Sequence, residues 1–185
     1  MIIEGLMTST ALDGTAHVAP MGPVVDASLK DWLLRPFQTS TTFANLYRTG
    51  TGVFHVVDDC LPIVQAALGL PIDLKFERLE CGAWVIPSAC HWYQLELHEW
   101  DISQPRAEVK ATVTQSVVIR PFWGWNRAKH AVLEATILAT RLHLTGVDSV
   151  LSELDRMALI VEKTAGDPEH EAWQLVSDYI RQWKS

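Results

Sequence analysis

The sequence has few cysteines, no long apolar run and no basic leader, and each shortage excludes a class of protein. Its three cysteines, Cys60, Cys81 and Cys90, show no C-x-x-C spacing, which favours a reducing compartment over a disulfide framework. No apolar run approaches the roughly 20 residues that a membrane span requires. The first residues meet the carboxylate Glu4 where a secretory signal would be basic. We therefore expect a cytoplasmic protein without a membrane segment.

Positive charge is also scarce, because 15 lysines and arginines face 22 acidic residues and the net charge is −7. A non-specific nucleic-acid binder needs a basic surface, so we expect no nucleic-acid partner. Glycine-rich phosphate loops of the G-x-G-x-x-G or Walker type are missing, as is the H-E-x-x-H metal motif, and Ser88 has no G-x-S-x-G surround. Nicotinamide Rossmann folds, nucleotide hydrolases, metal sites and serine hydrolases are therefore not expected.

Two look-alike stretches are present instead. Arg35-Pro36-Phe37 is followed by the small polar residues 40–45, and Arg120-Pro121-Phe122 is followed by residues 125–128. Each has an arginine and a rigid Pro-aromatic turn before a predicted helix start, where free backbone N–H groups gather around an anion. We predict that both stretches wall one phosphate site. The alternative is that both are dimer contacts only.

The first two-thirds of the chain has the pattern of an antiparallel β structure with short helices. Strands are predicted over 2–10 and 15–21, joined by the turn dipeptide Asp13-Gly14, and over 51–57, 89–100 and 107–119. Ser40 and Gly50 are typical of the two ends of a short helix, and Asp58-Asp59 open another. Long antiparallel strands of this kind predict a mainly β barrel.

Pro20 cannot donate a hydrogen bond to a strand ladder, so we place the end of the second strand at a sheet edge. The backbone N–H groups of Met21 and Gly22 are then free to face a flat ligand. The alternative is a strand that simply ends there.

The last third of the chain predicts helices over 126–144, from 148 to about 166, and from 167 onward. In the first of them a charged stripe lies between two apolar sectors and should be partly buried and paired, whereas Lys129 and Thr136 should face water. The members of that stripe are Arg127, His130, Glu134 and Arg141. We expect residues 1–125 to form the barrel core and residues 126–185 a helical cover of the same domain.

Several motifs resemble the family catalogued as domain of unknown function 447, which is similar to the FMN-binding split barrels of pyridoxamine phosphate oxidases and flavin reductases. The resemblance covers nearly the whole chain in the same order. It is carried by His17-Val18-Ala19-Pro20-Met21-Gly22, Arg35-Pro36-Phe37, Ser40-Thr41-Thr42, Asn45-Leu46, Val56-Val57-Asp58-Asp59 and Gly124-Trp125-Asn126-Arg127-Ala128.

The resemblance implies a homodimer with FMN at or near the subunit interface. It places the isoalloxazine ring along the end of the second strand. It also implies that two residues of a later motif bind the cofactor, without assigning the contacts that they make. One departure is His55, where the family pattern has asparagine. The implied phosphate contacts are Arg35, Thr39, Ser40, Thr42 and Asn45, the implied ring contacts are Pro20, Met21 and Gly22, and the two motif residues are Asn126 and Arg127.

The function that follows is an FMN-dependent oxidoreductase of open substrate, with NAD(P)H as a transient reductant. The resemblance suggests a pterin or one-carbon substrate, and the alternative is a dimer that binds flavin or another phosphorylated ligand without catalysis. If a proton donor is needed, His17 and His55 are the first choices, since histidine titrates near neutral pH; a structural role is the alternative for both. Trp123 and Trp125 are either flavin-stacking residues or aromatics that bury a large area at the barrel rim or at a dimer contact.

Overall fold

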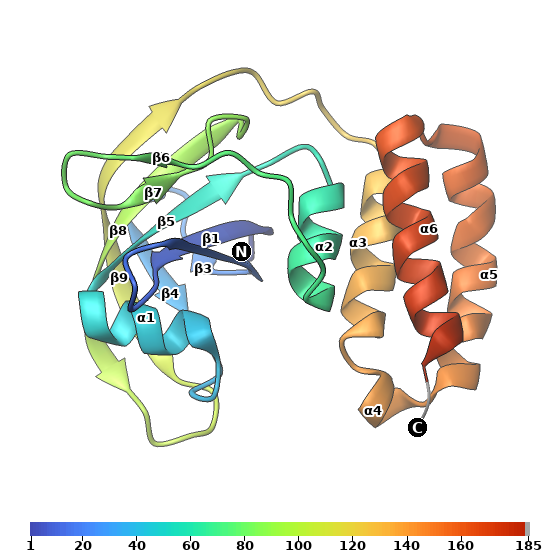
Figure 1. Cartoon of the computed structure of the whole chain (residues 1–185), viewed down its shortest axis with the longest axis horizontal. Coiled ribbons are helices and arrows are strands. Elements are labelled where there is room, and N and C mark those ends of the chain that lie inside the picture. Colours follow the sequence, from blue (N-terminus) through green and yellow to red (C-terminus); the bar gives the residue numbers. More distant parts are fainter. Residues whose placement is uncertain (184–185) are drawn as a thin grey trace. The chain divides into compact units, whose positions relative to one another are not determined.

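The structure, a computed structural model, describes residues 1–183 and divides into two compact units (Figure 1). The barrel unit consists of Met1–Val57 and Leu74–Phe122. The helical unit consists of Asp58–Asp73 and the chain from Trp123 onward. The segment Asp58–Asp73 thus leaves the barrel sequence to join the helices. Within the described residues, no helix is long and apolar enough to cross a membrane.

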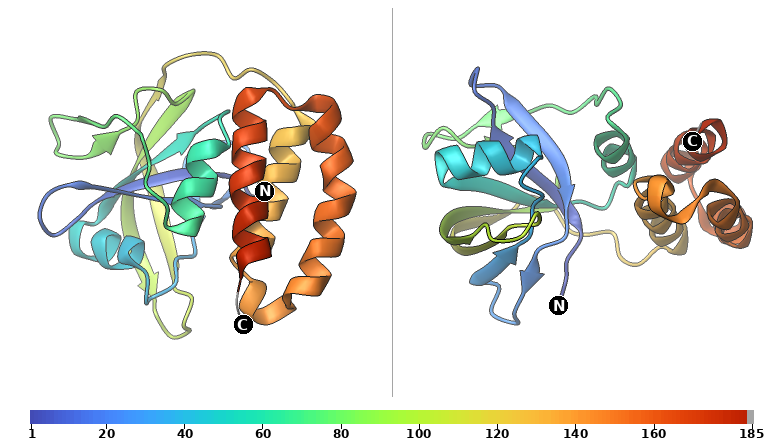
Figure 2. Two further views of the ribbon diagram at one scale, coloured as in Figure 1. Left: turned by 45° about the vertical axis from the view of Figure 1, so that its right-hand side comes forward. Right: turned by 90° about the horizontal axis from the view of Figure 1, so that it is seen from below.

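The barrel unit is built on a seven-stranded antiparallel sheet with the order β2-β1-β5-β8-β9-β4-β3. The isolated bridge between Ile2 and Val24 joins the residues before β1 to β3, so the curled sheet is linked across by the segment that leads into β1 (Figure 2). The predicted antiparallel barrel is confirmed, and Pro20 lies on β2, at the edge of the strand order, as predicted. The strands are β1 (Gly5–Thr10), β2 (Ala16–Met21), β3 (Val24–Val25), β4 (Asp31–Leu34), β5 (Thr51–Val56), β8 (His91–Asp101) and β9 (Glu108–Val118).

The inner face of this sheet carries the core of the barrel unit. Trp32 and Phe54 meet edge to face with their ring centroids 5.2 Å apart, which is a favourable aromatic geometry. The predicted alternation of β9 is confirmed where Val109 and Ala111 point into this core. Because successive residues of a strand point to opposite faces, the polar residues between them remain at the surface.

The helix α1 (Thr41–Thr49) covers the inner face at one end of the barrel. It begins at Ser40, whose side chain accepts a hydrogen bond from the N–H of Phe43, and it ends at Gly50 with φ +67°. Both predicted helix boundaries are confirmed, since a positive φ suits glycine and a serine oxygen caps a first-turn N–H. Leu46 of α1 is fully buried in the barrel core, whereas Tyr47 is 56% exposed.

Two short strands that the sequence did not indicate, β6 (Glu77–Arg78) and β7 (Trp84–Val85), form a separate hairpin. Val85 and Ala83 pack with Val53 and Trp92, whose side chains alternate with the inner-face residues Phe54 and Tyr93. The segment therefore covers part of the outer face of the sheet. Strands of two residues carry too little alternation for sequence periodicity to reveal them.

The helical unit contains α2 (Leu61–Leu68), α3 (Arg127–Ala139), α4 (Leu142–Thr145), α5 (Val147–Thr164) and α6 (Asp167–Gln182). The predicted helix over 126–144 is two helices, because α3 ends at Ala139 and α4 begins at Leu142. The small residues of α3 are buried as expected, with Ala128 and Ala135 fully enclosed. Small side chains allow neighbouring helix backbones to approach closely, and α3 packs against α2, α5 and α6.

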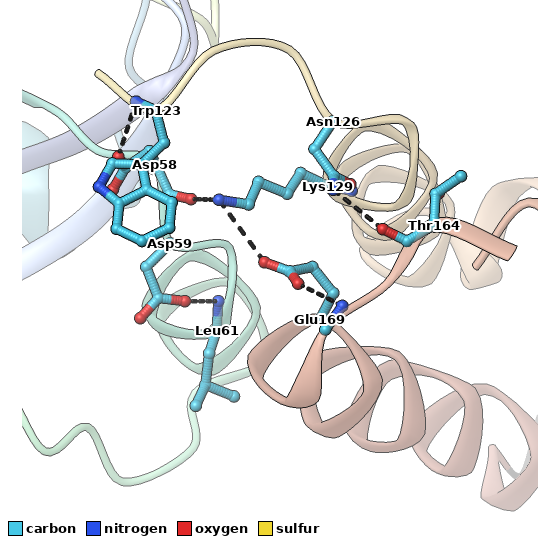
Figure 3. A network of polar contacts seen from close by, with 9 residues as sticks. Asp58, Asp59, Leu61, Trp123, Asn126, Lys129, Thr164 and Glu169 are labelled. Carbon is cyan, nitrogen blue, oxygen red and sulfur yellow. Dashed lines mark hydrogen bonds and ion pairs between the residues drawn. The ribbon is translucent and has the colours of Figure 1, made fainter. Parts of the chain in front are cut away.

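The partial burial predicted for the charged stripe of α3 is wrong for a single chain, and its pairing with a second subunit stays a prediction. The members of the predicted stripe, Arg127, His130, Glu134 and Arg141, are all exposed. Lys129, expected to face water, instead lies half-buried and donates to the carbonyl of Asp58, with its Nζ 3.5 Å from Glu169 Oε1 (Figure 3). Thr136, also expected at the surface, is 2% exposed. Angular position on one helix cannot show that α2 and α6 cover the Lys129 side, and this decides which charges are buried.

Candidate functional site

A cluster of polar side chains lies where α1 meets β1 and β2. The amide of Asn45 donates to Ser9 Oγ over 3.1 Å, and His17 Nε2 lies 3.2 Å from Thr42 Oγ1. Ser9 and His17 are cross-strand partners, so both point to the same face, toward α1. Burial lowers the pKa of His17 below its ordinary value, which keeps the imidazole neutral at pH 7. Two of the predicted phosphate contacts, Thr42 and Asn45, thus already have protein partners.

The connection from β4 to α1 holds the other predicted phosphate contacts. Ser40 Oγ caps α1 and also donates to the carbonyl of Phe37 over 2.7 Å. Thr39 is exposed. The guanidinium Nε of Arg35 is buried and has no hydrogen-bond partner within the described residues. A buried donor without a partner costs free energy, so Arg35 is the residue of this group whose side chain most needs another molecule.

The two Arg-Pro-Phe stretches do not wall one site within a single chain. Arg35 follows the end of β4, where Leu34 pairs with Val109 near the beginning of β9. Arg120 follows the far end of β9, an 11-residue strand. At about 3.3 Å per residue, the two arginines are on the order of 30 Å apart along the sheet. Sequence likeness between two turns carries no information about which end of a sheet they occupy, and a shared site made with a second subunit stays a prediction.

The predicted ring-binding residues lie on the same edge strand as His17. Pro20 and Met21 follow His17 along β2, and Met21 shares its face because the side-chain period of a strand is two. A Cβ on Gly22 would lie 2.9 Å from the Glu4 carboxylate and 3.0 Å from Ile2. The close passage of residues 2–4 therefore explains this glycine. That the N–H groups of Met21 and Gly22 face a ligand stays a prediction.

Met21 belongs to a row of inner-face residues that crosses the sheet at the end away from α1. The register pairs Met21 with Gly5, Val56 with His91, and His91 with Val118. In the pairing of β1 with β5, Leu6 lies opposite His55, so Gly5 is the next residue along and lies opposite Val56. All five positions therefore point to one face of the sheet.

The two ends of the inner face differ in their cover. Near α1, Leu34 and Val109 are completely buried and Leu97 is 7% exposed. In the opposite row, Val118 is 69% exposed although it points to the same face. The inner face is therefore sealed at the α1 end and open at the other, where Met21 and the family's implied ring position lie.

His55 is a structural residue of the barrel. It is completely buried, its Nδ1 donates to the carbonyl of Leu6 over 3.2 Å, and its Nε2 accepts from the N–H of Ile86 over 3.1 Å. Burial lowers the pKa of His55 to about 4. Because both ring nitrogens are used by the backbone, His55 is not available as a proton donor. The imidazole at this position thus makes hydrogen bonds of its own, and they tie the segment after β7 to the sheet.

Asn126 and Arg127 lie at the start of α3 in the helical unit. The Asn126 side chain accepts from the N–H of Lys129 and donates to the carbonyl of Thr164 over 2.9 Å. Its amide therefore caps the helix and joins α3 to the end of α5 (Figure 3). Arg127 is exposed. A cofactor contact by either residue stays a prediction.

Trp123 and Trp125 are the most exposed tryptophans described, each 87% exposed. The N–H of Trp123 is held by Asp58 Oδ2 over 3.2 Å, and the Trp125 ring stacks on His130 with centroids 5.4 Å apart. Neither side chain is therefore buried within a single chain, and burial at a dimer contact stays a prediction. Whether they stack on a flavin stays a prediction. No cluster of metal-ligating side chains occurs among the residues the structure describes.

Sequence reasoning passed over His91. Its Nε2 is buried without a hydrogen-bond partner in the described chain, and its ring stacks on Tyr93 with centroids 4.2 Å apart. Burial lowers its pKa below the ordinary value. The sequence offered one signal, because β8 alternation places His91 and Tyr93 on the same face, but only the sheet register shows that this face is the inner one.

Comparisons with known proteins agree with this architecture. The N-terminal family model described as "Protein of unknown function (DUF447) N-terminal domain" matches residues 3–120, and the C-terminal model "Protein of unknown function (DUF447)" matches residues 126–178. No curated protein matches the chain. Among solved structures, the FMN-bound protein MM1853 from Methanosarcina mazei, of the same family, is similar with a TM-score of 0.83 and 23% identity over 96% of this chain and 94% of that one.

Two flavin reductases share the barrel fold. The flavin reductase HpaC complexed with NADP+ has a TM-score of 0.57 and 10% identity over 68% of this chain and 82% of its own. The flavin reductase PheA2 has a TM-score of 0.53 and 18% identity over 62% and 79%. The expected split-barrel fold is confirmed by these likenesses. With both of its parts matched over most of its length, the chain belongs to the DUF447 family.

Proposed function

We propose that this protein is an FMN-binding flavoprotein that acts as an oxidoreductase. The similar DUF447 protein from Methanosarcina mazei is FMN-bound, and the fold is shared with flavin reductases. The observation in this chain that carries the proposal is the buried Nε of Arg35, which has no hydrogen-bond partner among the described residues and belongs to the segment that leads into α1.

The residues present fit a flavin phosphate. A phosphate near −2 requires several donors and a cation, and the fork of an arginine matches its oxygens. Arg35 supplies an unused donor, and the first-turn N–H groups of Thr41 and Thr42 have no acceptor inside the helix. The positive end of the α1 dipole adds to the attraction. Thr39 and Thr41 are exposed at this helix start and would add hydroxyl donors.

The strand β2 connects this phosphate cradle to the open end of the inner face. His17 touches Thr42 at the cradle, and Met21 lies four residues farther on the same face, roughly 13 Å away. That span matches an elongated ligand with an anionic tail and a flat apolar head. Met21 and Val56 then offer apolar surface to the ring, and Arg35 fixes the tail.

FMN would supply the hydride and electron chemistry when bound. The residues of this chain would bind the phosphate, orient the ring along β2 and limit the access of water. NAD(P)H is our proposed reductant, supported by the fold shared with an NADP+-bound flavin reductase. A pterin substrate remains a proposal from the family resemblance.

We also infer a homodimer. Val117 and Ile119 at the end of β9 are 36% and 40% exposed. Among the described residues, β9 does not pair with β4 beyond Thr112, so the last part of the strand is an edge that exposes these apolar side chains. Such edges are normally covered, and a second copy of the chain is our proposed cover. The mass of the purified protein in solution tests this, and a monomer at micromolar concentration would refute it.

Flavin binding is tested by titrating the purified, flavin-free protein with FMN and with riboflavin, which lacks the phosphate. We expect FMN to bind one per chain and more tightly than riboflavin. Arg35→Ala should weaken FMN binding roughly 10-fold to 100-fold, the range for losing a charge-assisted contact, and leave riboflavin affinity nearly unchanged. Arg141→Ala, which removes an exposed arginine of the helical unit, is the matched control.

Two results would contradict this proposal. If the wild-type protein binds neither flavin, the flavoprotein function is wrong. If Arg35→Ala loses FMN and riboflavin equally, Arg35 does not hold a phosphate. Steady oxidation of NAD(P)H by the yellow protein with an added acceptor would support an oxidoreductase, whereas tight binding without reduction by NADH or NADPH would favour the non-catalytic flavin carrier.

A further inference from the structure

We propose that His91 is a ligand-contacting residue whose imidazole hydrogen-bonds to a polar atom on the edge of the bound isoalloxazine ring. This rests on the proposed flavin binding and adds to it a residue at the ring rather than at the phosphate. The observation behind it is a buried imidazole nitrogen that lacks a hydrogen-bond partner among the described residues.

The location of His91 supports a ligand over an internal partner. His91 lies in the same inner-face row as Met21, at the end where Val118 is 69% exposed. Its neighbours on this face, Val56 and Tyr93, present mainly apolar surface. One nitrogen heterocycle set among apolar side chains is the usual composition of a site for a flat ligand, in which few polar groups fix the orientation.

The state of the ring also suits this role. The Tyr93 ring, which is 8% exposed, stacks on the imidazole at an interplanar angle of 27° and favours this plane of the ring, which a half-turn about χ2 preserves. Burial keeps His91 neutral at pH 7 by lowering its pKa, and a neutral imidazole has one donor and one acceptor nitrogen. Because His91 as a whole is only half-buried, rotation about χ2, which is broad for histidine, brings the buried nitrogen to the exposed side without refolding.

The contrast with His55 separates this proposal from a general property of barrel histidines. His55 Nδ1 and Nε2 are both bonded to backbone groups, so its burial is fully compensated. His91 Nε2 is buried without that compensation. An uncompensated polar group in a fold is often kept for a ligand or a reaction, and His91 lies at the end of the sheet where the ring site is proposed.

The deciding experiment combines flavin affinity with stability. His91→Phe keeps an aromatic ring on Tyr93 but removes both nitrogens. We expect it to bind FMN and riboflavin each roughly 10-fold more weakly, because the lost contact is to the ring that both ligands share. The flavin-free variant should melt at the same temperature as the wild type or higher, since an uncompensated nitrogen has been removed. His98→Phe, an exposed position on the same strand, is the matched control.

A second measurement reads the contact directly. The imidazole ¹⁵N resonances of His91 in the full-length protein should shift on addition of FMN and also on addition of riboflavin, and His91→Gln should recover part of the affinity because an amide retains a donor and an acceptor. Unchanged affinity in His91→Phe with unshifted ¹⁵N resonances, while the wild type binds FMN, would overturn this proposal and leave the flavoprotein function intact. Affinity and melting temperature falling together would assign His91 a structural role instead. Wild-type protein that binds neither flavin would overturn both proposals.

Discussion

The helical unit and the barrel unit use their buried polar groups differently. In the helical unit, Glu169 pairs with Lys129 and also accepts from the N–H of Gly166, and Asn126 bonds at both ends of its amide. In the barrel unit, three buried side-chain nitrogens lack partners within the described residues, those of Arg35, Trp84 and His91; the helical unit has one such atom, Ser177 Oγ.

This difference indicates where ligand chemistry belongs. A polar group that is already committed to the fold cannot serve a ligand without loss of stability, whereas a partnerless one costs stability until a ligand arrives. Changes to the polar network of the helical unit should therefore reduce stability without a specific effect on flavin affinity. Changes to Arg35 or His91 should do the opposite.

The largest expected effect on stability is that of Glu169→Ala. It leaves the half-buried Lys129 ammonium without its carboxylate and removes the bond to Gly166, and together these losses should destabilise the protein by about 3 kcal/mol. Urea unfolding followed by circular dichroism measures the change. Glu171→Ala, an exposed acid of the same helix, should change stability by less than about 0.5 kcal/mol. A similar small change for Glu169→Ala would show that the network contributes little.

The next effect tests a polar group of the barrel that is committed to the fold. His55→Asn keeps a donor for Leu6 but leaves the buried N–H of Ile86 without an acceptor, so we expect a loss of about 2 kcal/mol at pH 7. If instead His55→Asn weakened flavin binding and left stability unchanged, the division between committed and partnerless groups would fail for the barrel.

The same substitution has a signature in pH. The pKa of His55 is about 4 in the folded protein and ordinary in the unfolded chain, so the unfolded chain binds a proton that the folded protein refuses as the pH falls from about 6.5 to about 4. Protonation of His55 in the unfolded chain therefore lowers the free energy of unfolding over this window by up to roughly 3 kcal/mol. His55→Asn has no imidazole at this position and lacks this pH dependence. The difference in free energy of unfolding between the wild type and His55→Asn should therefore become smaller on acidification. Unfolding curves at pH 7 and pH 5 measure it, and a constant difference would show that His55 does not titrate in this window.

The smallest effects are expected at the exposed charges of α3. Glu134→Ala and Arg141→Ala, alone or combined, should change stability by less than about 0.5 kcal/mol, because surface charges are screened by water and salt. Thermal melting of the three variants checks this. A loss above about 1 kcal/mol for the pair would mean that the sequence-based prediction of a buried network was right in solution, for example at a subunit contact.

The sequence by itself determined the features that depend on near neighbours along the chain. Ser40 and Gly50 bounded α1, Asp13-Gly14 placed the first hairpin, and Pro20 assigned β2 to an edge, because capping, turn conformation and a missing N–H are local properties. The motifs also indicated the family, and the family resemblance predicted the barrel fold.

Only the tertiary structure decided which polar groups are used up and which are left for a ligand. His55 and His91 both lie on barrel strands, yet His55 meets Leu6 and Ile86 from distant segments, while His91 has a nitrogen without a partner in the described part of the chain. Lys129 rather than Glu134 is paired because Asp58 and Glu169 come from other parts of the chain. The physical reason is the same in each case: a side chain's burial and hydrogen bonds are set by elements far away in sequence, which no local pattern encodes.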